Sequence, residues 1–245
     1  MTRALTMAFS TASYAVFLAT FLYLIGFVGG FDVLPRTVDS GPAAAPGVAA
    51  AIDLALITVF ALQHSIMARP AFKARWTRIV PNAAERSVYV LAASLALILL
   101  FAAWRPIPTV IWSVGGPAAW ALWGVFALGW TLVLLSTFLI NHFELFGLQQ
   151  AWFNLRGRAA AAPQFRQPLF YKLVRHPLYT GFFIAFWATP FLTAGHLLLA
   201  GGMSVFMLIA IQLEERDLID VFGDQYRVYR QRVGMLVPRF GVRGR

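Results

Sequence analysis

Long runs of apolar residues are the feature that most constrains what this chain can form. Several runs approach the roughly 20 residues that an α-helix needs to cross the hydrocarbon layer of a bilayer. Of the 245 residues, 60% are hydrophobic and 12% are charged, which leaves more apolar surface than a soluble domain can bury. The sequence therefore predicts an all-α fold, a polytopic transmembrane helix bundle, because helices satisfy their own backbone groups in lipid.

Six apolar segments are candidates for membrane helices. They cover residues 8–31, 47–68, 87–104, 118–140, 178–194 and 196–213. The last two are short and are joined tightly through Ala194-Gly195-His196. This pattern is consistent with six crossings, or with four full spans followed by a hairpin that enters the membrane and returns. We predict five to six membrane segments, with the last two forming a hairpin.

The basic residues predict how the segments are oriented. With a cytoplasmic N-terminus, that side carries Arg3, Arg69, Lys73, Arg75, Arg78, Arg86, Arg156, Arg158, Arg166, Lys172, Arg175 and an Arg-rich tail. The opposite side carries Arg36 and Arg105. This asymmetry follows the positive-inside rule and accounts for the net charge of +10 without a nucleic-acid partner. We expect a protein of the inner (plasma) membrane whose basic face contacts anionic lipid in the cytoplasmic leaflet.

Several classes of protein are excluded or disfavoured by missing features. The chain has no cysteine, which excludes disulfides, thiolate metal sites, Fe–S clusters and a cysteine nucleophile. No Gly-x-Gly-x-x-Gly string or phosphate-binding loop is present, which disfavours a soluble nucleotide-binding domain. Without internal repeats or linkers, we predict one domain over residues 1–245, with a membrane core at 8–213 and a cytoplasmic helical tail at 214–245. No metal site is predicted.

Polar residues converge at the predicted cytoplasmic ends of four segments. They are Gln63 and His64, then Asn141, His142 and Glu144, then Arg175 and His176, and finally Glu214 and Glu215. Each one alone is typical of a residue that marks the water boundary. Their convergence predicts a functional face. Asp53 differs because it lies inside an apolar run; it is about 16 Å along the helix from His64, so we predict that it makes a structural hydrogen bond.

The most informative string is Arg175-His176-Pro177-Leu178-Tyr179-Thr180-Gly181. Proline suits the first turn of a helix and disfavours helical geometry in the preceding residue, so a helix is predicted to begin at Pro177. Its N-terminal N–H groups and dipole favour an anion. Gly181 permits close approach of a ligand or of a neighbouring backbone. An ordinary start of a membrane helix is equally consistent with this string.

The tail contributes a second polar pattern. Glu214 and Glu215 are predicted to continue the last membrane helix past the bilayer, and two adjacent carboxylates suit a cationic or zwitterionic ligand. Phe222-Gly223-Asp224 predicts a helix end followed by a new N-cap at Asp224. In the helix that follows, Tyr226, Tyr229 and Val233 share one face. The alternative for this helix is an amphipathic segment that rests on the membrane.

Together these strings resemble the integral membrane methyltransferases that include isoprenylcysteine carboxyl methyltransferase and the phospholipid methyltransferases. The resemblance rests on Arg-His-Pro-x-Tyr-x-Gly, then Glu-Glu-x-x-Leu, Phe-Gly, spaced tyrosines and a final Val-Pro-Arg. It implies S-adenosylmethionine as the cofactor. The binding residues that it implies are Arg175, His176, Pro177, Tyr179, Gly181, Glu214, Glu215 and Tyr229.

Four further strings, at residues 62–70, 85–89, 104–108 and 141–148, are similar to the methanethiol S-methyltransferases. Related membrane proteins of nitric-oxide metabolism share parts of them. The resemblance implies methyl transfer to a small thiol, namely methanethiol, which would yield dimethyl sulfide. Because the thiolate is the reactive form, His142 and His64 are our candidates for a catalytic base. Candidates for the wall of an apolar pocket are Phe143, Phe146 and Trp152.

Other functions remain open on the sequence. The same fold is consistent with methylation of a prenylcysteine carboxylate or of a lipid headgroup. A transporter or channel, with Asp53 and His64 along its path, predicts polar residues through the depth of several spans, and most spans here are nearly free of them. A haem or quinone protein would need an intramembrane histidine pair, which the four histidines do not clearly form.

Overall fold

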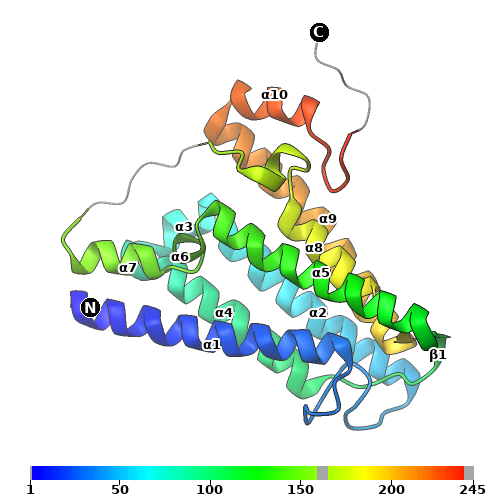
Figure 1. Cartoon of the computed structure of the whole chain (residues 1–245). Coiled ribbons are helices and arrows are strands. Elements are labelled where there is room, and N and C mark those ends of the chain that lie inside the picture. Colours follow the sequence, from blue (N-terminus) through cyan, green and yellow to red (C-terminus); the bar gives the residue numbers. More distant parts are fainter. Residues whose placement is uncertain (1, 159–164, 240–245) are drawn as a thin grey trace. The chain divides into compact units, whose positions relative to one another are not determined.

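The computed structural model describes residues 2–158 and 165–239 and is almost entirely helical (Figure 1). Five helices are long and apolar enough to cross a membrane. They are α1 (Arg3–Gly29), α2 (Pro46–Ala68), α4 (Asn82–Ala103), α5 (Gly116–Ile140) and α9 (Ala194–Phe222). The predicted all-α, multi-pass membrane bundle is confirmed.

The predicted segment at residues 178–194 is shorter than expected. It forms α8 (Pro177–Trp187), whose 11 residues extend about 16 Å, so this helix cannot cross the hydrocarbon layer alone. Pro190 explains the early end, because it has no N–H and its ring would clash with the preceding helical turn. Six helical crossings are therefore wrong. The predicted turn at residues 194–196 is wrong as well, since α9 already begins at Ala194.

The chain divides into two compact units. The first contains Met1–Val114, Phe143–Ala161 and Phe191–Met203. In it α4 packs against both α1 and α2, and α7 (Leu148–Leu155) packs against α1. The short helix α3 (Pro70–Trp76) follows α2 directly. Strand β1 (Val110–Ser113) pairs antiparallel with β2 (Phe191–Thr193).

Polar side chains at one end of the first unit bind main-chain atoms. Asp53 is completely buried, and its Oδ1 accepts a hydrogen bond of 2.9 Å from the backbone N–H of Arg105. The indole of Trp104 donates to the carbonyl of Val38 at 3.0 Å, in the loop after α1. These bonds join the start of α2, the end of α4 and that loop. The predicted structural hydrogen bond of Asp53 is confirmed.

The second unit contains Gly115–His142, Ala162–Pro190 and Ser204–Arg245. In it α8 packs against α5 through two glycines. A Cβ on Gly181 would lie 2.7 Å from the carbonyl oxygen of Gly129, and a Cβ on Gly129 would lie 2.7 Å from the backbone nitrogen of Ala185. No larger residue fits at this crossing. Of the two uses predicted for Gly181, the structure shows close approach of a neighbouring backbone.

Helix α8 also forms an antiparallel hairpin with the second half of α9. Near one end of the hairpin, the indole of Trp187 donates to Ser204 at 3.0 Å. Near the other end, His176 contacts Glu215. The hairpin predicted for the last two segments is thus present, although one of its arms is the short α8.

The tail folds back on the protein. As predicted, α9 continues to Phe222; Gly223 then adopts φ 56°, and α10 (Asp224–Arg232) follows. The N-cap of α10 is Gly223, one residue earlier than predicted. Tyr226, Tyr229 and Val233 form the predicted common face. This face packs within the protein against Phe165, Leu218, Ile219 and Phe222.

Candidate active site

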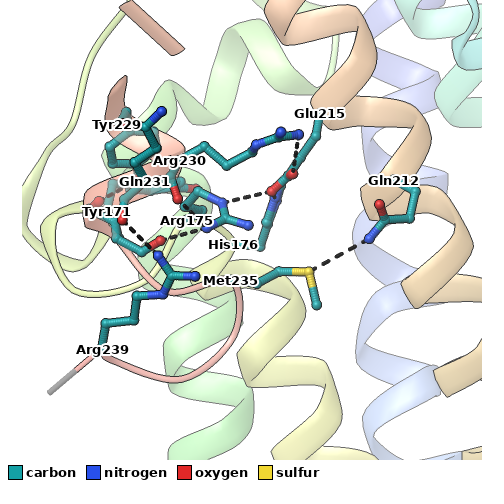
Figure 2. Close-up of polar contacts among 11 residues, drawn as sticks. Tyr171, Arg175, His176, Gln212, Glu215, Tyr229, Arg230, Gln231, Met235 and Arg239 are labelled. Atoms are coloured by element: carbon teal, nitrogen blue, oxygen red, sulfur yellow. Dashed lines mark hydrogen bonds and ion pairs between the residues drawn. The ribbon is translucent and has the colours of Figure 1, made fainter. Parts of the chain in front are cut away.

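The start of α8 meets α9 in a buried cluster of ionisable side chains (Figure 2). Arg175 donates from Nε to Oε1 of Glu215 at 2.7 Å, and Nε2 of His176 lies 3.1 Å from the same oxygen. The side chains of Arg175 and Glu215 are 8% and 5% exposed. The Arg175 guanidinium and the hydrogen bond with His176 offset the cost of removing the charge of this carboxylate from water.

Local chemistry explains how His176 reaches this position. Pro177 occupies the first turn of α8, as predicted, and His176 lies just outside the helix at φ −126° and ψ 64°. In this non-helical geometry its backbone N–H donates to the carbonyl of Met235 at 3.1 Å. The imidazole is buried and held against Glu215. The proline therefore fixes the residue on which the cluster depends.

The C-terminal residues complete the cluster. Arg175 donates from Nη1 to the carbonyls of Arg230 and Val233 at the end of α10, and its backbone N–H donates to the carbonyl of Gly234 at 2.8 Å. The hydroxyl of Thr180 lies 3.0 Å from the carbonyl of Leu236. Residues 233–236, which we term the strap, thus run along the start of α8.

Glu214 differs from its neighbour. It is half-buried, and within residues 2–158 and 165–239 no hydrogen bond or ion pair engages its carboxylate. Burial raises the pKa of Tyr171 above its usual range, and the charge of Glu214 adds to that effect. The Glu214 carboxylate therefore acts electrostatically on Tyr171, whose carbonyl accepts a hydrogen bond from Tyr229.

Two tyrosines of α10 line the same region. The hydroxyl of Tyr226 is buried with no hydrogen-bond partner in the part of the chain that the structure describes. Tyr229 donates to the carbonyl of Tyr171, and burial raises its pKa to about 12. Burial likewise raises the pKa of Tyr226, so both hydroxyls keep their hydrogens at neutral pH. An unused buried donor beside an unused carboxylate fits a ligand that carries both a cationic group and acceptor atoms.

The remaining predicted residues on α8 have clear positions. Tyr179 presents its ring edge-on to that of His176, with centroids 5.7 Å apart. Pro177 is buried. Gly181 contacts α5, as described above. Of the residues predicted on α8, Tyr179 is therefore the one with a ring contact to the ion cluster, through His176.

His142 belongs to the same unit and begins α6 (His142–Leu145), just after α5 ends at Ile140. Its Nδ1 is 2.8 Å from Oγ1 of Thr137, and the Thr137 hydroxyl donates its hydrogen to the carbonyl of Leu134 at 2.7 Å. This arrangement suits the tautomer with its hydrogen on Nδ1, which has its lone pair on Nε2. Burial lowers the pKa of His142, so its neutral form is favoured. A neutral imidazole with a basic Nε2 is the form that a proton acceptor requires.

His64 belongs to the first unit. Its Nε2 lies 2.8 Å from the hydroxyl of Tyr89, and the guanidinium of Arg86 lies 4.9 Å from the centre of the Tyr89 ring. Of the predicted pocket residues, Phe146 stacks on Phe17 with centroids 3.9 Å apart. Phe143 and Trp152 are about half exposed. These residues of the first unit make contacts of their own and are not part of the Arg175 cluster.

Sequence reasoning missed several residues near the Arg175 cluster and near His64. Tyr226 was predicted only to share a helical face with Tyr229 and Val233. No role was predicted for Tyr89 or Thr180. Their partners lie far away in the sequence: Tyr89 is 25 residues from His64, and Thr180 is 56 residues from Leu236. No local periodicity signals such contacts. A buried tyrosine hydroxyl is a general signal for a missing partner, but it requires the tertiary structure.

Comparison with known proteins agrees with this arrangement. The NnrU protein family matches residues 54–238. A methanethiol S-methyltransferase of Mycobacterium tuberculosis is 55% identical over 239 residues, which cover 97% of this chain and 98% of the relative. Methanethiol S-methyltransferase 2 of Bradyrhizobium diazoefficiens is 51% identical over 243 residues, covering 99% and 93%. A methanethiol S-methyltransferase of a Pseudomonas species is 51% identical over 237 residues, covering 94% and 89%. No solved structure matched the chain.

The fold and the comparisons define an integral membrane protein of helical architecture with a buried ionisable cluster between two adjacent helices. The chain belongs to the NnrU protein family and, within it, to the methanethiol S-methyltransferase family. The resemblance predicted from its motifs is confirmed.

Proposed function

We propose that this chain transfers a methyl group from S-adenosylmethionine to methanethiol and releases dimethyl sulfide. The main support is the 55% identity to a named methanethiol S-methyltransferase along 97% of the chain. The cluster at the start of α8 supports the choice of donor. Glu214 is a carboxylate without a partner among the described residues, and the Tyr226 hydroxyl is an unused buried donor.

The residues of the second unit have distinct tasks in this reaction. S-adenosylmethionine, when bound, supplies a methyl group made electrophilic by a positively charged sulfur. The carboxylate of Glu214 opposes that positive charge, and the Tyr226 hydroxyl donates a hydrogen bond. His176 and Tyr179 form the wall at the start of α8. Holding both reactants in line can lower the barrier by about 7–11 kcal/mol.

The thiol must lose a proton as its sulfur is methylated. His142 is our first candidate for the acceptor because its contact with Thr137 suits the tautomer whose lone pair is on Nε2. The proton passes to Nε2, the sulfur's electron pair forms the new carbon–sulfur bond, and the bond between the methyl group and the donor's sulfur breaks. His64, whose Nε2 forms a hydrogen bond with the Tyr89 hydroxyl, is the second candidate for the proton acceptor.

The location of the reaction follows from the basic residues. Arg166, Lys172 and Arg175 precede α8, and Arg227, Arg230 and Arg232 lie in α10. By the positive-inside rule, this end of the second unit faces the cytoplasm, where S-adenosylmethionine is made available to it. A small apolar thiol reaches the site from the bilayer or from water.

Purified protein in detergent tests this function directly. With S-adenosylmethionine and methanethiol, we expect dimethyl sulfide in the headspace, and none when either reactant is omitted. Parallel reactions with a prenylcysteine and with phosphatidylethanolamine test the two alternative acceptors. Absence of dimethyl sulfide together with methylation of either alternative acceptor would overturn the proposed substrate.

A further inference from the structure

The guanidinium of Arg175 is already engaged in this structure by protein atoms from two directions (Figure 2). Nε donates to Glu215 on α9 at 2.7 Å, and Nη1 donates to the carbonyl of Arg230 at 3.1 Å and to that of Val233. A cationic side chain at the C-terminal carbonyls of α10 also complements the dipole of that helix. Arg175 therefore joins α9, the end of α10 and its own position before α8.

The backbone beside Arg175 strengthens the same connection. The N–H groups of Arg175 and His176 donate to the carbonyls of Gly234 and Met235 at 2.8 and 3.1 Å, and Val174 forms a parallel bridge with Gly234. Thr180, one turn into α8, reaches the carbonyl of Leu236. The strap is thus bonded at successive residues to the segment that fixes His176.

Glu215 on α9 holds Arg175 on the side opposite the strap. Its Oε1 accepts from Arg175 and lies 3.1 Å from His176, while its Oε2 lies 3.8 Å from the guanidinium of Arg230. The carboxylate is thus surrounded by three basic side chains. The adjacent Glu214 has no such partners among the described residues, so the two glutamates of the motif have different environments.

We propose that Arg175 is a positioning residue, which together with Glu215 clamps the strap across the first turn of α8 and does not itself bind the methyl donor. The strap holds His176 in its non-helical geometry and keeps α10, with Tyr226, packed against the end of α9, the helix that carries Glu214. Donor affinity then depends on Arg175 through preorganisation of this wall, because an unclamped tail must be ordered again upon binding. This inference rests on the proposed function for its donor-binding measurement.

Two variants separate positioning from direct binding. Arg175→Lys keeps the charge but loses the forked donor geometry. Gly234→Ala alters the strap alone, because a Cβ there would lie 1.9 Å from the carbonyl oxygen of Val237. Neither of these two variants changes the net charge of the protein. The matched control is Arg227→Lys, which changes an exposed ion pair with Asp224 on α10.

The experiment measures donor affinity, steady-state rates and tryptic cleavage of the full-length protein in detergent. For both Arg175→Lys and Gly234→Ala, we expect the Kd for S-adenosylmethionine to rise at least about tenfold. The KM for methanethiol and the kcat at saturating donor should change by less than about threefold. Without donor, trypsin should cleave the tail at Arg230, Arg232 or Arg239 faster than in wild type, because cleavage follows the open population. Arg227→Lys should match wild type.

Each other outcome has a definite meaning. If Arg175→Lys weakens donor binding while Gly234→Ala does not, and cleavage without donor is unchanged, Arg175 contacts the donor and the inference is overturned. If wild type does not bind S-adenosylmethionine, the proposed function fails. Tryptic cleavage alone would then test whether Arg175 holds the strap. Faster cleavage of both variants would support this role, and unchanged cleavage would overturn it.

Discussion

Asp53 in the first unit and Glu215 in the second are both buried carboxylates, but they are held in different ways. Asp53 accepts a hydrogen bond from the backbone of Arg105, at a point where the ends of helices join. Glu215 is held by the side chains of Arg175 and His176, beside the unengaged Glu214. The first arrangement stabilises architecture. The second brings charged and titratable side chains together, which is typical of functional sites.

The largest effect that would sharpen this contrast is expected at His142 in the second unit. Replacement by glutamine removes the basic Nε2, and we expect kcat/KM to fall about 10²–10⁴-fold. Burial lowers the pKa of His142 from 6.5, so in wild type the rate should fall only when the pH drops through that lowered value and the ring becomes protonated. Dimethyl sulfide formation, followed from about pH 5 to pH 8, should lack this acid limb in His142→Gln.

His64→Gln is the matched control for that measurement. This variant changes a histidine of the first unit, and that histidine is hydrogen-bonded to the Tyr89 hydroxyl. If His64→Gln, and not His142→Gln, abolished the acid limb, the catalytic base would belong to the first unit and the contrast between the two units would be broken.

A smaller effect is expected at Glu214. Replacement by glutamine keeps the shape but removes the negative charge that opposes the cationic donor. A hydrogen bond to a charged group contributes about 1.5–3 kcal/mol, so donor affinity should weaken about 10–100-fold with little change in the KM for methanethiol. Equilibrium dialysis with labelled S-adenosylmethionine measures this change. Asp220→Asn, at an exposed acidic position on the same helix, should bind as wild type does; equal affinity in both variants would exclude Glu214 from the site.

The smallest effect on donor binding is expected at Asp53. Asparagine at this position retains an acceptor for the Arg105 N–H, but it places an amide donor where Oδ2 has no partner among the described residues. We expect a loss of about 1–3 kcal/mol in unfolding free energy. Thermal unfolding in detergent should show the lower stability, while the Kd for S-adenosylmethionine stays the same. A loss of donor affinity as large as that of Glu214→Gln would show that Asp53 serves the reaction too.

Local chemistry predicted the starts and ends of several elements. The helix start at Pro177 and the break at Gly223 depend on the backbone limits of single residues, so they could be read from the chain. The structural bond of Asp53 followed from the cost of an isolated charge in an apolar run. The same local view overestimated the segment after Pro177, because hydropathy continued past Trp187 while Pro190 stopped the helix.

The two glutamates show where local reasoning ends. Sequence placed both next to the Arg-His string, and the resemblance implied that both bind the cofactor. Their different roles depend on which one faces Arg175 and His176, some 40 residues earlier in the chain. Adjacent residues of a helix point about 100° apart, so packing of α8 against α9 selects one for the cluster and leaves the other free.

By itself, the sequence determined that this chain is a helical membrane protein with a basic, polar face, since run length and charge placement are properties of the chain alone. It also determined the family, since the motifs can be recognised without coordinates. The tertiary structure alone decided that Gly181 serves helix packing, that Tyr226 retains an unused hydroxyl and that the strap closes on Arg175. Those outcomes depend on atoms that become neighbours only after the helices pack.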